Sequence, residues 1–209
     1  LNMESTAKSD AELINRYRDM SIYPEVEIAI DDIVSEAIVT ESDKSPVRLG
    51  TKNLDLSDGV KNKIVEEFDN VLRLLNFTRM GYDIFKSWYV DGKLFYHIII
   101  DENKPKDGIK ELRKIDPRLI KKVKQVEKGT DKNKNVLVKN VKEYYLYNEK
   151  GLGTADKQSG IPISKDSISH VTSGLRDSRK QHSIGHLHKA IKALNQLKMV
   201  EDSVVIYRW

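Results

Sequence analysis

The clearest candidates for chemistry are acidic and basic side chains on either side of one apolar run. Glu102 and Lys104 follow the run 94–100, and Asp83 and Asp91 precede it. Two carboxylates could hold Mg²⁺ beside a lysine that stabilises charge on a phosphate, as nucleases of the PD-(D/E)xK type require. The same residue types also occur at an ordinary junction between a strand and a turn. We favour the turn and keep a Mg²⁺-dependent nuclease as an alternative.

Three histidines form a second candidate site. His182 and His186 are four residues apart, so a helix would place them on one face, where they could bind Zn²⁺ or Ni²⁺ with a third ligand. His188 would point elsewhere on that helix. The sequence has no HExxH motif and no cysteine, and histidines without such a motif are more often ordinary polar side chains. We therefore predict no metal site and no cofactor.

One segment begins like a nucleotide-binding loop. Gly151, Gly153 and Asp156 have the spacing at which a dinucleotide fingerprint opens, but the third glycine and a following helix are missing. The sequence also lacks a Walker A motif and a nucleophile elbow. We predict a loop here, and a chain that does not itself hydrolyse ATP.

The segment 110–142 is strongly basic. It carries 12 basic and 4 acidic side chains, a net charge of +8. Such a segment could contact nucleic-acid phosphates regardless of base sequence, and Tyr144, Tyr145 and Tyr147 could stack on bases. The alternatives are a solvated hairpin and tyrosines that pack against neighbouring strands. The sequence leaves the role of 110–142 open, and we assign no DNA-lining residue.

Charge is divided unevenly along the 209 residues. Residues 1–109 carry 14 basic and 21 acidic side chains, whereas residues 110–209 carry 22 and 11, so a net charge of +4 conceals two halves of opposite sign. A basic half can attract a polyanion or meet an acidic neighbouring subunit. The absence of cysteine fits assembly in a reducing cytosol. No apolar run reaches the roughly 20 residues that a membrane span requires.

Apolar periodicity predicts the elements that must position these side chains. We expect helices over 10–20, 24–40 and 57–76, with Ser9, Pro24 and Ser57 at their starts, and an amphipathic helix that ends at Asp91-Gly92. Strands are expected near 47–49, over 94–100, 109–115, 119–127 and 136–148, and within 161–171. Because both alternating faces of 94–100 are apolar, we expect that strand to be covered on both sides. The fold class is therefore α+β.

The C-terminal segment is predicted as one long helix. Residues 183–209 would extend roughly 40 Å, with apolar side chains on more than one stripe, so we expect the fold or neighbouring subunits to bury them. Because Trp209 falls inside this pattern and the first residue is not Met, we expect a piece of a longer chain. The predicted organisation is a flexible lead at 1–9, an α+β body at 10–182 and the helix at 183–209.

The order of residues in several segments is similar to one protein family. These segments are RMGYDIFKSWYVDGKLFYHIIIDENKPKDGIKELRKIDPR at 79–118, AELINRYRDM at 11–20, YYLYN at 144–148 and LHKAIKALNQLKMVEDSVVIYRW at 187–209. Together they resemble the portal vertex protein, or head-tail connector, of large contractile-tailed bacteriophages, most closely the cyanophage-like branch. The last segment is the most specific, because helix formation alone does not demand its order.

The resemblance implies a structural subunit and not an enzyme. It implies a dodecameric ring at one capsid vertex of the virion, assembled in the host cytoplasm, through which double-stranded DNA is packaged and ejected. A terminase motor, capsid or scaffold proteins and neck proteins would be its partners. The present chain would be the wing-like portion ahead of a stem and clip. A sequence-nonspecific nucleic-acid-binding module is the alternative.

Overall fold

The helices lie where apolar periodicity places them. The computed structural model describes residues 10–39, 46–130, 136–151, 160–177 and 183–207. Its α-helices are α1 (Asp10–Ser21), α2 (Pro24–Ala37), α3 (Asp58–Leu74), α4 (Phe77–Asp91) and α5 (Ile191–Tyr207). Pro24 starts α2, as predicted, because its fixed φ suits the first helical position and its missing N–H is not needed there. Gly92 ends α4 with a φ of 74°, in the left-handed region that glycine adopts without strain.

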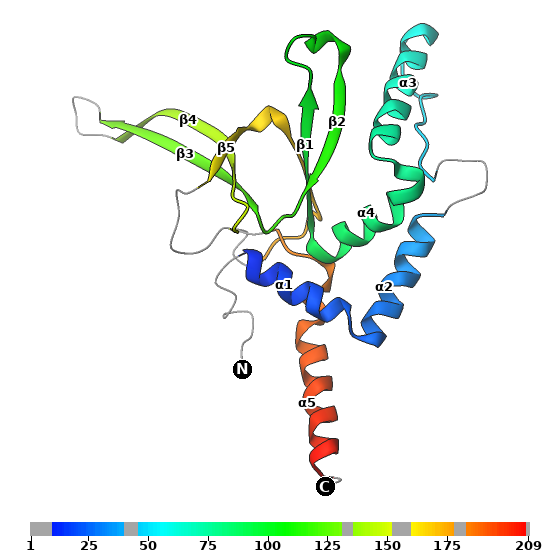
Figure 1. Cartoon of the computed structure of the whole chain (residues 1–209), viewed down its shortest axis with the longest axis vertical. Helices are drawn as coiled ribbons and strands as arrows, with labels where there is room; N and C mark the ends of the chain where they lie inside the picture. Colours follow the sequence, from blue (N-terminus) through cyan, green and yellow to red (C-terminus); the bar gives the residue numbers. More distant parts are fainter. Residues whose placement is uncertain (1–9, 40–45, 131–135, 152–159, 178–182, 208–209) are drawn as a thin grey trace.

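Two small antiparallel sheets complete the α+β fold, and this class was predicted correctly. The first has the order β2-β1-β6, and the second the order β3-β4-β5. The strands are β1 (Lys93–Ile100), β2 (Ile109–Ile115), β3 (Ile120–Thr130), β4 (Val136–Tyr147), β5 (Ile161–Ser164) and β6 (Ile168–Thr172). Short 3-10 turns, η2 (Pro105–Asp107), η3 (Lys165–Ser167) and η4 (His186–Ala190), lie between them and before α5. Figure 1 shows β3 and β4 projecting from one flank, α2 and α3 on the other, and α5 leaving in a third direction.

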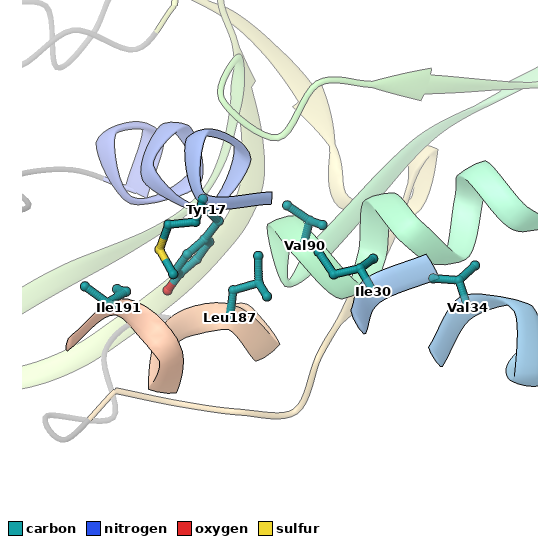
Figure 2. Packing of buried hydrophobic residues seen from close by; sticks show 7 residues of the cluster. Tyr17, Ile30, Val34, Val90, Leu187 and Ile191 are labelled. Atoms are coloured by element: carbon teal, nitrogen blue, oxygen red, sulfur yellow. The ribbon is translucent and has the colours of Figure 1, made fainter. Parts of the chain in front are cut away.

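Two apolar clusters hold the described elements together. The first joins α1, α2, α4 and the start of α5 through Tyr17, Met20, Ile30, Val34, Val90, Leu187 and Ile191, most of which Figure 2 labels. The second joins the two sheets through Phe95, Ile115, Ile120, Tyr145 and Ile168. Burying side chains of this size contributes about 1.5 to 3 kcal/mol each relative to exposure. These clusters therefore fix α5 and the β3–β4 hairpin to the body.

Two local predictions were wrong. No strand forms at 47–49 among the described residues. Only the first part of β1 is buried, and Ile100 is 47% exposed, because β6 pairs only with the stretch from Lys93 to His97 and leaves the rest of the β1–β2 hairpin uncovered. Ser57 is at the N-cap position of α3, as predicted, although within the described part of the chain its side chain makes no capping hydrogen bond. Ser9, proposed as the cap of α1, lies outside the described residues.

The predicted long helix from 183 to 209 begins later than expected. Ser183 forms a β-bridge with Arg176, Gly185 has extended backbone, and the α-helix starts at Ile191 after the 3-10 turn η4. A Cβ on Gly185 would collide with the carbonyl oxygen of Val90, so this stretch passes directly over the end of α4. Packing against α4 outweighs the helical pattern here, and glycine and histidine are weak helix formers in any case.

Candidate subunit interface

The base of α5 is fixed to α1. The hydroxyl of Tyr17, a residue that is 1% exposed, lies 2.7 Å from Nδ1 of His188, to which it can donate a hydrogen bond. Leu187 and Ile191 pack around the same ring (Figure 2). Burial raises the pKa of Tyr17 above its ordinary value, so the phenol stays neutral and keeps its proton. The direction in which α5 leaves the body is therefore set by buried contacts.

An ion-pair network holds α1 against the body beside this joint. Arg18 donates from Nε and Nη2 to the two carboxylate oxygens of Asp91, at 3.0 and 2.7 Å, and from Nη1 to Asp116 at 3.1 Å. Arg118 also donates to Asp116, at 2.8 Å, and to Asn15 at 2.9 Å. Burial acts to raise the pKa of Asp116, but hydrogen bonds from Arg118 and Arg18 hold it well below its usual range. Asp91 and Asp116 thus serve in structural ion pairs.

The outer part of α5 is exposed and apolar on all sides. Only Ile191, at its base, is buried among its residues. The exposed apolar side chains are Leu197, Met199, Val200, Val204, Val205, Ile206 and Tyr207, and Ile206 is 74% exposed. At 100° per residue these positions point in every direction around the axis, and Figure 1 shows α5 projecting from the body. A helix of this kind needs a covering surface, so burial of α5, expected from the sequence, is not achieved by the described residues.

The β3–β4 hairpin forms a basic arm. On one face Glu143 accepts from Lys122 and Lys165, each at 3.0 Å. Hydrogen bonds from these two lysines lower the pKa of Glu143 to about 2. Lys124 stands opposite Glu143 on the same face and is exposed. The next pair outward on this same face is Val126 with Val141, and both of its side chains are exposed as well.

The tyrosines of β4 pack within the fold. Tyr145 is buried in the second cluster, Tyr147 packs against it, and Tyr144 is half-buried. The hypothesis that Tyr145 stacks on bases is therefore wrong. The alternative, that it packs against neighbouring strands, is confirmed. The ring of Tyr145 contacts His170 edge-on, and His170 stacks on Phe95 with ring centroids 4.2 Å apart. Burial, with smaller contributions from Lys93 and Lys122, lowers the pKa of His170 to about 4.

The outer face of α2 is a surface that sequence reasoning did not single out. Glu25, Ile28, Asp32 and Glu36 are all exposed and recur at the spacing of one helix face, opposite the buried Ile30 and Val34. A helical wheel of 24–37 could have found this face. By contrast, no local signal could have paired Arg18 with Asp91, because 73 residues separate them.

The side chains of the nuclease alternative are not brought together. Asp91 lies before β1, is 4% exposed and binds Arg18, whereas Glu102 and Lys104 are exposed beyond the other end of that strand. An eight-residue strand spans roughly 26 Å, which is too far for one metal ion to bridge. Asp83 is exposed on α4, eight residues before Asp91. This geometry gives no support to Mg²⁺-dependent cleavage.

The two described histidines of the candidate metal site, His186 and His188, contact different aromatic side chains. His186 stacks on Tyr89 with ring centroids 4.6 Å apart, while His188 faces Tyr17. His182 lies outside the described residues, as do Gly153 and Asp156 of the glycine loop. In the part of the chain that the structure describes, no three His, Asp or Glu side chains form a group that could hold a metal ion. None of the helices over the same residues has both the length and the hydropathy to cross a bilayer.

Comparison with known proteins identifies the family. The family model described as Bacteriophage T4-like portal protein (Gp20) matches residues 10–209. The chain belongs to the T4-like portal protein family. It is 41% identical to the portal protein of Vibrio phage KVP40 over 206 residues, which cover 94% of this chain and 40% of that protein. It is 33% identical to the portal protein of Salmonella phage ViI over 223 aligned residues, covering 99% of this chain and 39% of that protein.

The resemblance found in the sequence is thereby confirmed at the level of the family. The chain spans about two fifths of the length of the curated portal proteins that it matches. The exposed apolar surface of α5 thus lies in a chain that is much shorter than the portal proteins it matches.

Proposed function

We propose that this chain is the wing-like portion of a phage portal subunit, a structural protein that acts by forming a ring. The match of the T4-like portal family to residues 10–209 is the observation that carries this proposal. In this proposal residues 10–182 form the wing-like body, and residues 183–209 lead into a stem. The apolar outer surface of α5 supports this division, because it would be buried once stems of neighbouring subunits stand side by side.

The ring would serve as a conduit and as an attachment point. Double-stranded DNA would pass through its centre during packaging and ejection, driven inward by a separate terminase motor. Capsid or scaffold proteins and neck proteins would bind its outer surfaces at the capsid vertex, after assembly in the host cytoplasm. DNA that must slide in both directions requires weak, sequence-independent contacts, because tight phosphate binding would stall it.

Mass photometry of the full-length gene product tests this proposal. We expect a single species of about a dozen copies, because identical heterologous contacts that close produce a ring. Negative-stain images of that species should show a central opening. A monomer or dimer at every protein and salt concentration would refute the proposal.

A nucleic-acid-binding module remains the second candidate, because Lys122 and Lys124 of the lysine-rich strand β3 are exposed. Its test is an electrophoretic shift assay at increasing salt. A module of this kind should bind DNA tightly at low salt without forming a ring, with an affinity that falls steeply as salt rises.

A further inference from the structure

The outer face of α2 combines an exposed apolar side chain with carboxylates. Ile28 is 63% exposed, and Glu25 and Asp32 stand three residues before it and four after it, on the same face. Glu36 continues this row by one more turn. The opposite face of α2 is the buried one, so the row points away from α1 and α4.

Three of the carboxylates on α2 have no cationic partner among the described residues. Asp31, on the flank of α2, pairs with Lys86 at 2.7 Å and accepts from Tyr82, but among the described residues no cation pairs with Glu25, Asp32 or Glu36. Asp32 and Glu36 are like charges four residues apart, which costs a few tenths of a kcal/mol. Glu36 also lies in the last turn of α2, near the negative end of the helix dipole, and that turn holds no basic residue. A cation from outside the subunit would relieve both effects.

The basic arm presents the opposite pattern. On the face described above, Lys122, Lys124 and Lys165 surround the single carboxylate of Glu143 and leave a local net charge of +2. The exposed pair of Val126 and Val141 adjoins these lysines. The arm therefore has an exposed apolar pair beside a cluster of net positive charge, and α2 has an exposed isoleucine flanked by carboxylates. Protein interfaces commonly combine an apolar core with a polar rim of complementary charge.

The positions of the two surfaces suit a ring. Figure 1 shows the arm on one flank of the subunit and α2 on the other, with α5 leaving between them. A closed ring of identical subunits needs two different, complementary surfaces on opposite flanks, so that each subunit meets the next in the same way. Both surfaces occur on every copy of this chain, so a second copy is the occupant that the charge pattern fits.

We propose that the outer face of α2 (Glu25, Ile28, Asp32 and Glu36) docks against the basic face of the β3–β4 arm of the adjacent copy. Ile28 packs against Val126 and Val141, and the three carboxylates pair with Lys122, Lys124 and Lys165. This inference rests on the proposed ring and assigns it one lateral interface.

Charge reversal in the full-length protein tests the pairing. The α2 variant is E25K/D32K/E36K, and the arm variant is K122E/K124E/K165E/E143K, which changes the sign of the arm face but keeps its internal ion pairs. Each variant alone should raise the protein concentration needed for half-assembly by at least about tenfold, because like charges then face each other. Combining both sets should restore assembly to near the unmodified level. Mass photometry across a concentration series is the readout.

A matched control reverses three exposed carboxylates on another helix. The variant E66K/E67K/D69K on α3 carries the same change in net charge and should assemble like the unmodified protein. Circular dichroism of each variant checks that the fold is retained. If the unmodified protein forms no ring, the proposed function itself fails.

Three outcomes would overturn the interface while leaving the ring intact. In the first, both single-surface variants assemble as the unmodified protein does. In the second, the combined variant is no better than either alone, or the α3 control is equally impaired. In the third, the arm variant assembles normally and loses DNA retention in a shift assay, which would make the arm a nucleic-acid surface.

Discussion

At the scale of single residues, Arg18 is the polar side chain whose loss we expect to destabilise the fold. It joins α1 to Asp91 and Asp116, and Asp91 is 4% exposed. We predict that R18A lowers the free energy of unfolding by about 2 to 4 kcal/mol, because Asp91 would be left buried without its partner. Urea unfolding of the monomeric protein measures this change. The control R79A removes an exposed arginine from α4 and should change stability by no more than about 0.5 kcal/mol.

If R18A unfolds at the same urea concentration as R79A, the network contributes nothing to stability. The variant R18A/D91N adds a second check. It should recover part of the loss, since an amide costs less to bury unpaired than a carboxylate does.

His170 makes the fold sensitive to mild acid. Its folded pKa of about 4 lies below the value of about 6.5 that an unfolded histidine has. As pH falls below 6.5 the unfolded chain takes up a proton that folded His170 does not, so stability decreases until about pH 4. We predict a loss of roughly 2 to 3 kcal/mol across this range from this residue.

The comparison variant H170F keeps a ring against Phe95 and cannot titrate. Urea midpoints at several pH values between 7 and 4 should fall less steeply for H170F than for the unmodified protein. Equal slopes would mean that His170 titrates normally in the folded state. Asp116 adds its own acid sensitivity only below about pH 4, because its folded pKa is depressed and the stability it contributes is lost as it protonates.

At the scale of elements, α5 is the clearest case of a helix that requires a partner. Its outer half exposes Val200 and Val204 on one side and Ile206 on another. We predict that V200E/V204E leaves the unfolding of the monomer nearly unchanged, because these side chains lie in solvent there, but abolishes ring formation, because carboxylates would be buried between subunits. The control E201Q/D202N alters exposed polar positions on the same helix and should still assemble.

Thermal unfolding of the monomer and mass photometry together check this prediction. If V200E/V204E forms rings as readily as the control, α5 does not lie between subunits. If the monomer itself unfolds, α5 is covered within the chain.

The elements themselves could largely be predicted, because their signals are local. Pro24 at the start of α2, Gly92 at the end of α4 and the apolar runs of β1, β2 and β4 each depend on a few neighbouring residues. The predictions from sequence failed where contacts between distant residues determined the local structure. Gly185 leaves the helical pattern because it crosses Gly92, 93 residues earlier: a Cβ on Gly92 would lie 2.6 Å from the Gly185 nitrogen. The end of β1 is exposed because its neighbour β6 is short.

The candidate surfaces could be predicted only in part. The basic segment 110–142 was evident from composition, but only the strand register shows that Lys122 and Lys124 share one face of the hairpin with the buried Tyr145. The acidic row on α2 has a helical spacing that a wheel would display. Which carboxylates of α2 find a cation among the described residues could not be inferred, because Lys86, the partner of Asp31, is 55 residues away in the sequence.

At the scale of the whole molecule, the β3–β4 arm, α2 and α5 extend in different directions (Figure 1). The arm and α2 lie on opposite flanks, and α5 extends between them (Figure 1). The net charge of residues 1–109 is opposite in sign to that of residues 110–209. This charge distribution suits a ring in which an acidic surface of each subunit contacts a basic surface of the next. On this account assembly weakens as salt rises, but the apolar contacts of α5 keep the ring closed at moderate ionic strength.

The measurement that tests the account most directly is electron cryomicroscopy of the full-length assembly. The account predicts a closed ring in which the α5 helices of adjacent subunits pack side by side around a central opening, and in which each arm lies against α2 of the next subunit. An assembly with α5 pointing outward into solvent, or the absence of any closed ring, would contradict it.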